Sequence, residues 1–191
     1  MANALHDRHK RPSSYSSIAI ALHWIIAVLI IANVIGALAA EGADRQTAGQ
    51  IMSAHKSIGL TVLVLSLVRL GWRLAHGFPP LPASTPRWDA IVARTTHFAF
   101  YFFMIAVPLA GWTMVSAGPR PLEWFGLFGW PKLPVSEALA GFAHDAHVIL
   151  AFSTVGLLVL HVAGALKHHL IDRDEVLSRM LPLVRRKTPT D

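Results

Sequence analysis

The sequence contains no cysteine among its 191 residues. This absence excludes disulfide bonds, thiolate-bound iron–sulfur clusters and thiol catalysis, so nitrogen or oxygen atoms must hold any metal. Charged residues are also scarce, at 15% of the chain against roughly 25% in a typical soluble protein, whereas 53% of the residues are hydrophobic. Together with a mean hydropathy of +0.47, this composition predicts an integral membrane protein surrounded by lipid.

Four long apolar segments predict membrane-spanning helices over about 18–40, 52–74, 92–117 and 144–169. The first holds 23 residues without a formal charge, enough for a helix to cross about 30 Å of hydrocarbon. A cleaved signal peptide is the alternative interpretation of this segment, but the apolar run exceeds the roughly 7 to 15 residues usual in such peptides. The expected fold class is therefore all-α, an integral membrane four-helix bundle formed by residues 18–170.

The distribution of basic residues orients this bundle. Thirteen of the seventeen Lys and Arg lie before the first span, around the connection between the second and third spans, or after the fourth. The positive-inside rule places these regions in the cytoplasm, so the N-terminal segment over 1–17 and the tail over 171–191 are both expected there. The pI near 10.3 then reflects membrane topology, and we expect no nucleic-acid partner.

The connections between the spans differ in character. The segment over 78–86 is rich in proline and is expected to be an irregular linker. The stretch over 118–134 mixes Trp and Phe with Gly and Pro, which predicts a loop or short helix at the outer membrane interface. The tail over 172–183 has the pattern of a short amphipathic helix on the cytoplasmic side.

Histidine is unusually abundant, with eleven residues, and a histidine within a membrane span indicates function by default. His147 and His161 are fourteen residues apart on one helix, which returns them to the same face at depths about 21 Å apart. His144 does not share this face and is predicted to be an interfacial residue. The histidines in or beside the spans are His23, His55, His97, His147 and His161.

Helix direction alternates through a bundle, and this alternation pairs the histidines by depth. His23 shares the cytoplasmic level with His161, and His55 shares the outer level with His147. No cysteine or intramembrane carboxylate completes a tetrahedral zinc shell, so two facing imidazoles at each level favour a six-coordinate haem iron. Two axial imidazoles leave no open position on the iron, which points to electron transfer. The alternative is that these histidines only form hydrogen bonds between helices.

Other polar residues near the spans have two interpretations each. Lys56, Arg69, Arg73 and Arg94 are candidates for pairing with haem propionates, or they anchor helix ends at the lipid headgroups. His97, one turn before Tyr101, could replace His23 as a ligand, bond a propionate or quinone oxygen, or bridge helices. Small residues such as Gly156 allow either helix packing or clearance for a macrocycle.

The order and spacing of these residues resemble the prokaryotic cytochrome b561 family over about Tyr15–Pro182, nearly the whole chain. The resemblance is carried by Ala21–Trp24 in the first span, His55–Gly59 at the start of the second, His97 with Pro108 and Gly111 in the third, the block from His147 through His161 to His169, the tail over 167–174, and Arg179–Pro182. No single motif is specific, but their combination is.

The resemblance implies a four-helix bundle in the bacterial inner membrane that binds two b-type haems, with His23 paired to His161 and His55 paired to His147. Superoxide oxidases are similar proteins, which transfer an electron from superoxide on the outer side to ubiquinone. The expected function is therefore that of a superoxide:ubiquinone oxidoreductase. The alternative is a cytochrome subunit that serves a partner dehydrogenase or hydrogenase.

Two residues near the outer surface are candidates for contact with the substrates. Trp124 lies in a loop that could cover the access path of quinone or superoxide, and Lys56 could attract an anion. A histidine-lined transporter of divalent metals is a further alternative. The interiors of the spans lack the Asp and Glu that a cation path through hydrocarbon usually needs, which argues against a transporter.

Overall fold

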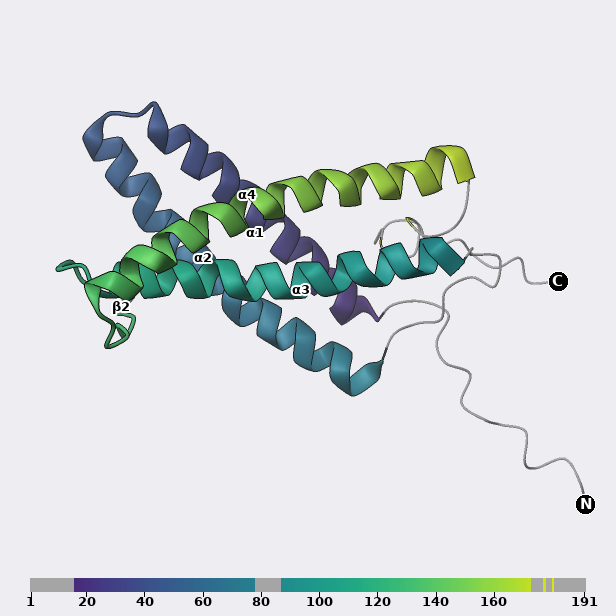
Figure 1. The fold of residues 1–191 in the computed structure, drawn as a ribbon, viewed down its shortest axis with the longest axis horizontal. Helices are drawn as coiled ribbons and strands as arrows, with labels where there is room; N and C mark the ends of the chain where they lie inside the picture. Colours follow the sequence, from purple (N-terminus) through teal and green to yellow (C-terminus); the bar gives the residue numbers. More distant parts are fainter. Residues whose placement is uncertain (1–15, 78–86, 173–176, 178–179, 181–191) are drawn as a thin grey trace, which may run out of the picture.

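The computed structural model describes residues 16–77, 87–172, 177 and 180, and it is dominated by four long helices (Figure 1). Helix α1 spans Ser17–Glu41, α2 Arg45–His76, α3 Arg87–Ser116 and α4 Glu137–Lys167, with a short π-helix, η1, over His168–Asp172. Two short strands, β1 over Glu123–Trp124 and β2 over Phe128–Gly129, lie between α3 and α4. The predicted all-α bundle is confirmed.

All four helices are long and apolar enough to cross a membrane. Even the shortest of them, α1 with 25 residues, rises about 38 Å at 1.5 Å per residue. Their outward-facing side chains are large and apolar, as lipid contact requires, and include Phe98, Phe152 and Leu160. The proline-rich segment over 78–86 and most of the predicted tail helix lie outside the described residues. Within the tail, the carbonyl of Met180 accepts a 2.7 Å hydrogen bond from the indole of Trp24.

Three helices begin five to seven residues earlier than the apolar segments predicted: α2, α3 and α4. Polar caps explain the early starts of α2 and α4. Helix α2 begins at Arg45, where Asp44 accepts hydrogen bonds from the Thr47 hydroxyl and from the backbone of Gln46 and Thr47. These bonds, led by that of the Thr47 hydroxyl, lower the pKa of the Asp44 carboxyl. Helix α4 begins at Glu137, where the Ser136 hydroxyl accepts from the backbone of Leu139.

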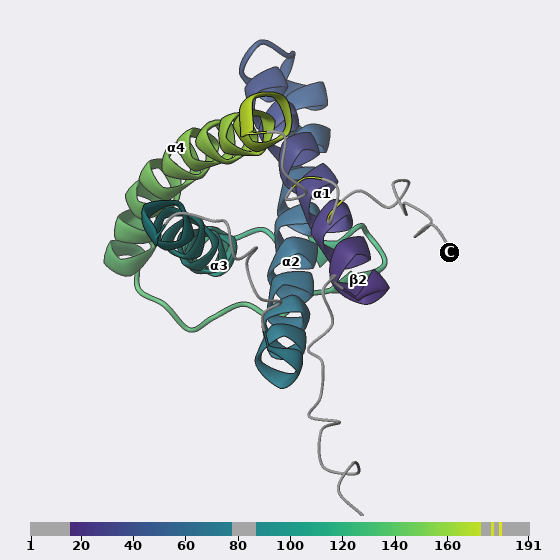
Figure 2. The same ribbon diagram turned by 90° about the vertical axis from the view of Figure 1, so that its right-hand side faces the viewer.

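The helices form two antiparallel pairs, with α1 beside α2 and α3 beside α4 (Figures 1 and 2). The first residues of α1 and the last residues of α4 lie at the same end of the bundle, as an even number of spans requires (Figure 1). Histidines on α1 and α2 can therefore face histidines on α4 only across the space between the pairs.

A small apolar core joins the two pairs near the middle of the bundle. It consists of Ile26, Val62 and Met104, with Tyr101 and Phe100 packed against it. Ile26 follows His23 by about one turn, and Val62 follows His55 by two turns. The core therefore lies between the two histidine levels.

The stretch over 118–134 is a loop that contains a small β-hairpin, not a helix. Trp124 pairs with Phe128 across the strands, and their rings stack with centroids 5.3 Å apart. The turn places Phe125 at φ 51° and Gly126 at φ 70°, a left-handed pair that suits glycine and strains phenylalanine. Sequence patterns cannot distinguish a hairpin of two-residue strands from an irregular loop, which is why the expectation left both a loop and a helix open.

A single buried serine attaches this hairpin to α2. The Ser57 hydroxyl is fully buried, accepts from the backbone N–H of Phe125 at 2.9 Å, and lies 3.3 Å from the carbonyl of Glu123. One turn further along α2, Thr61 accepts a 3.0 Å hydrogen bond from the indole of Trp124. The hairpin is therefore fixed by polar contacts to the half of α2 that carries His55.

Replacement of Ser57 by alanine should release the hairpin, because the partly buried Phe125 N–H loses its acceptor at a cost of about 1 kcal/mol. Hydrogen–deuterium exchange should become faster over 123–129 in the S57A variant. Ser53→Ala is the matched control, since its side chain is exposed. Equal exchange in S57A and the wild type would show that the hairpin is held by its aromatic packing instead.

Two histidine pairs form the candidate functional site

Four histidines meet in two pairs across the space between the helix pairs. The ring centroids of His55 on α2 and His147 on α4 are 6.2 Å apart, with an interplanar angle of 72°. Those of His23 on α1 and His161 on α4 are 6.3 Å apart, with an angle of 68°. These are the two pairings expected from depth, and α4 contributes one imidazole to each.

The spacing within each pair fits one metal ion between two imidazoles. A metal–imidazole bond is about 2 Å and the ring centroid lies about 1 Å beyond the nitrogen, so opposed ligands of one ion have centroids about 6 Å apart. Among the described residues, no group of three or more His, Asp or Glu could hold a bare metal ion. The donor sets therefore fit an iron whose remaining ligands come from a macrocycle, as in b-type haem.

Backbone carbonyls orient the pair of His55 and His147, which is called the outer pair after the orientation expected from the basic residues. The Nδ1 atom of His147 lies 2.9 Å from the carbonyl oxygen of Val107, and that of His55 lies 3.3 Å from the carbonyl oxygen of Asn33. Because a carbonyl only accepts, Nδ1 carries the proton in both rings. Each Nε2 is then left unprotonated, the form in which an imidazole nitrogen can bind a metal.

Gly111 makes room for the imidazole of His147. A Cβ atom at position 111 would lie 3.1 Å from two atoms of that ring, closer than ordinary van der Waals contact. The absence of a side chain on α3 thus allows the ring to reach the Val107 carbonyl. Gly156 on α4 has no such neighbour within 4 Å, so it is not needed for clearance between protein groups.

The outer pair opens into a cavity of about 690 Å³ between the helix pairs, within the roughly 300–1,000 Å³ range of cofactor and ligand pockets. Most of its wall is apolar, and Met104 of the core forms part of it. Asn33 and His144 also line the cavity. The Asn33 side-chain oxygen is buried and has no hydrogen-bond partner among the described residues.

The pair of His23 and His161, called the inner pair after the same expected orientation, has a third histidine close to it. The ring centroid of His97 on α3 lies 5.9 Å from that of His161, about as close as the ring of His23. Phe100 meets His161 edge-on at 5.1 Å. The geometry at His161 is therefore compatible with a partner on α1 or on α3.

The predicted cationic residues divide between the two ends of the bundle. Arg69 donates a 2.5 Å hydrogen bond to the carbonyl of Ala19, and its charge acts on both His23 and His97. Arg73 is buried nearby, donates to the carbonyl of Gly77 at 3.2 Å, and lies within electrostatic range of His97. Arg94 is exposed on α3. Lys56 is at the outer end.

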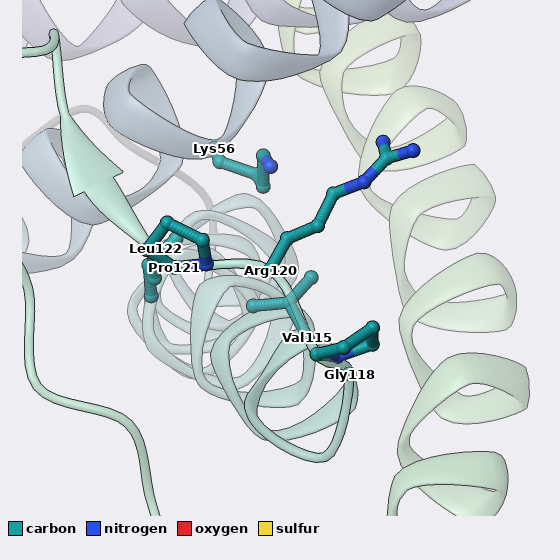
Figure 3. Close-up of a pocket in the computed structure, with 7 residues that line it drawn as sticks. Lys56, Val115, Gly118, Arg120, Pro121 and Leu122 are labelled. Atoms are coloured by element: carbon teal, nitrogen blue, oxygen red, sulfur yellow. The ribbon is translucent and has the colours of Figure 1, made fainter.

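A second cavity of about 410 Å³ adjoins the outer one and carries two cations (Figure 3). Lys56 from α2 and Arg120 from the loop after α3 both line it. Lys56 and two apolar neighbours also line the larger cavity, so the two cavities share a wall. Lys132 donates to the carbonyls of Gly118 and Arg120 and fixes this loop. Sequence reasoning missed Arg120, because only the fold brings it beside Lys56.

The outer tryptophans have different positions from those expected. Trp124 packs on α2 against Thr61 and is not among the described residues that line the large cavity. Trp112 on α3 does line it, and is held by a 2.8 Å hydrogen bond to the Pro131 carbonyl and by edge contact with Trp130. The sequence offered no signal that separated Trp112 from the interfacial tryptophans.

Comparison with known proteins gives consistent relationships across nearly the whole chain. The family model described as prokaryotic cytochrome b561 matches residues 14–183. Cytochrome b561 homolog 2 of Escherichia coli (strain K12) is 34% identical over 89% of this chain and 92% of its own. The probable superoxide oxidase CybB of Yersinia pestis is 28% identical over 93% and 99%. Cytochrome b562 of Cereibacter sphaeroides is 31% identical over 87% and 94%.

Replacement of Gly111 by valine should displace the His147 ring, because the added atoms overlap it. If this ring is a metal ligand, the G111V protein should bind about half as much cofactor per chain as the wild type, measured by the pyridine haemochrome assay. Gly156→Val, on the open face of α4, should bind the full amount. Full binding by G111V would mean that the His147 position is not required.

Proposed function

The chain belongs to the prokaryotic cytochrome b561 family, and we propose that it is a dihaem b-type oxidoreductase that passes electrons from superoxide to ubiquinone in the bacterial inner membrane. Members of this family are membrane electron-transfer cytochromes with b-type haem. The observation that supports two haems in this chain is the occurrence of two imidazole pairs with centroids 6.2 and 6.3 Å apart. The proposed orientation has both termini in the cytoplasm, so the pair of His55 and His147 faces outward.

In this proposal four histidines hold the two cofactors. His23 and His161 would hold the inner haem, and His55 and His147 the outer one. Bound haem supplies a one-electron iron couple at each level. The protonated Nδ1 atoms of the outer rings keep their Nε2 atoms directed at the metal, and the apolar cavity wall excludes water. Two protein ligands for each haem would favour electron transfer over dioxygen binding.

Two observations support superoxide as the outer donor. One relative carries the name probable superoxide oxidase. In addition, Lys56 and Arg120 line a cavity that shares a wall with the outer histidine cavity, and such paired cations raise the local concentration of an anion. Two superoxide ions each lose one electron and become dioxygen. Ubiquinone takes up those two electrons with two protons to become ubiquinol.

A cytochrome subunit that serves a partner dehydrogenase or hydrogenase is the second candidate function. It is favoured by the exposed apolar tip of the hairpin, where Phe125, Leu127 and Phe128 are 48%, 73% and 52% exposed. These side chains could contact a partner protein as well as lipid. A subunit that copurifies with the chain in mild detergent, together with no superoxide-dependent activity of the chain alone, would favour this candidate.

Single histidine replacements test the proposed ligands. His161→Ala should lose one haem and His147→Ala the other, because an iron with one imidazole is held weakly. His97→Ala should keep both, which makes it the matched control from the same cluster. Reduced-minus-oxidised spectra and haem content per chain decide the result. Loss of a haem in H97A with retention in H23A would move the inner ligand to α3.

Charge reversal at the cationic cavity tests the proposed donor. Lys56→Glu combined with Arg120→Glu should lower kcat/KM for superoxide about tenfold at low salt, with a smaller effect at high salt. The measurement is superoxide-dependent reduction of a ubiquinone analogue by purified protein. Arg45→Glu, an exposed change at the same end of α2, is the control. Equal rates for the double variant and the control would exclude steering by this cavity.

A further inference from the structure

We propose that the chain holds its two haems at different reduction potentials, lower at the His55–His147 pair and higher at the His23–His161 pair. The inference rests on the proposed function, because it takes these four histidines as axial ligands. It adds a direction to the proposed electron path. The two pairs differ in the hydrogen bonds of their imidazoles and in the cations around them.

The outer imidazoles are the stronger electron donors. Both donate from Nδ1 to a backbone carbonyl, His147 at 2.9 Å and His55 at 3.3 Å. A hydrogen bond of this kind raises the basicity of the opposite ring nitrogen. A more basic ligand stabilises the ferric state over the ferrous state, so the potential of the outer iron falls.

The inner imidazoles lack this support. Within the part of the chain that the structure describes, neither His23 nor His161 has a hydrogen bond to a backbone carbonyl. Ring edges surround His161, with centroids of Phe100 at 5.1 Å and His97 at 5.9 Å. The imidazoles of His23 and His161 are therefore weaker electron donors than the outer ones. Weaker donation favours the ferrous state, so the reduction potential of the inner iron is higher.

Cations near the inner pair act in the same direction. Arg69 is held between α1 and α2 by its bond to the Ala19 carbonyl, and its charge acts on His23. Arg73 is only 8% exposed and lies at the same end. A nearby positive charge disfavours the extra charge of ferric iron, and burial limits screening by salt.

Lys56 opposes this difference, because it is a cation beside the outer pair. It lines the cavity at the outer surface together with exposed loop residues, where water and salt weaken its field. Arg120, which lines the same cavity, is exposed and is screened in the same way. These two screened cations therefore offset only part of the effect of two arginines and of two imidazole hydrogen bonds. An electron that enters at the outer pair then moves to the higher potential across the core of Ile26, Val62 and Met104.

Two variants should move the two potentials separately. In Arg69→Gln the higher potential should fall while the lower one stays, and Arg69→Lys, which keeps the charge, should remain close to the wild type. In Gly111→Ala the added Cβ pushes the His147 ring by a few tenths of an ångström and weakens its bond to Val107, so the lower potential should rise. Both changes bring the two potentials closer together.

The experiment is a spectroelectrochemical titration of the purified, haem-loaded protein and of these three variants. Two separate one-electron waves would support the inference if R69Q lowers only the higher potential and G111A raises only the lower one. A single unresolved wave, or a fall of the lower wave in R69Q, would overturn it. If the R69Q protein cannot be produced, the titration of G111A is sufficient to test the assignment. A shift of the higher-potential wave in G111A would contradict it.

Different results would overturn the proposed function and the inferred order of the potentials. Fewer than two haems per wild-type chain would overturn both the proposed ligands and this inference. Two haems with the order of potentials reversed would overturn only the inference. Two haems in the stated order without superoxide-dependent quinone reduction would support the inference and remove the proposed donor.

Discussion

Helix α4 determines the depth of both histidine pairs, because it carries one member of each on the same face. The fourteen residues between His147 and His161 place the two imidazoles about 21 Å apart along the helix, one toward each side of the membrane. The partners on α1 and α2 meet them only because the antiparallel helix pairs face each other (Figure 2). The apolar core fills the level between them. Any shift of α4 along its axis would disrupt both pairs together.

The surroundings of the two pairs differ more than the pairs themselves. The ring separations of the two pairs are similar, but their environments differ. The outer imidazoles are hydrogen-bonded to backbone carbonyls, whereas the inner imidazoles lie near arginines. On α3, the missing side chain at Gly111 and the carbonyl of Val107 act together on one ring. A bundle of simple apolar helices thus creates two unlike environments from a few backbone groups and charges. These differences matter for electron transfer, because they act on potential without changing the ligands.

Much of this arrangement could be predicted from the sequence, and the remainder had physical reasons to be missed. Helix periodicity and alternating direction were enough to pair His23 with His161 and His55 with His147. Apolar length found the spans but not the starts of α2, α3 and α4, and α2 and α4 begin at the caps of Asp44 and Ser136. Arg120 reaches its cavity only through the loop after α3, and a loop carbonyl, that of Pro131, holds the side chain of Trp112 on α3. The proximity of His97 to His161 depends on how α3 packs against α4, which spacing along one helix does not report.

The central claim is that two imidazole pairs hold two haems in one chain. The most direct measurement is the haem content of the purified protein by pyridine haemochrome, together with its reduced-minus-oxidised visible spectrum. We expect two low-spin b-type haems per chain. One haem would mean that one of the pairs only joins helices. A folded protein that binds none when haem is supplied during expression would contradict the account and return the four histidines to helix packing or metal transport.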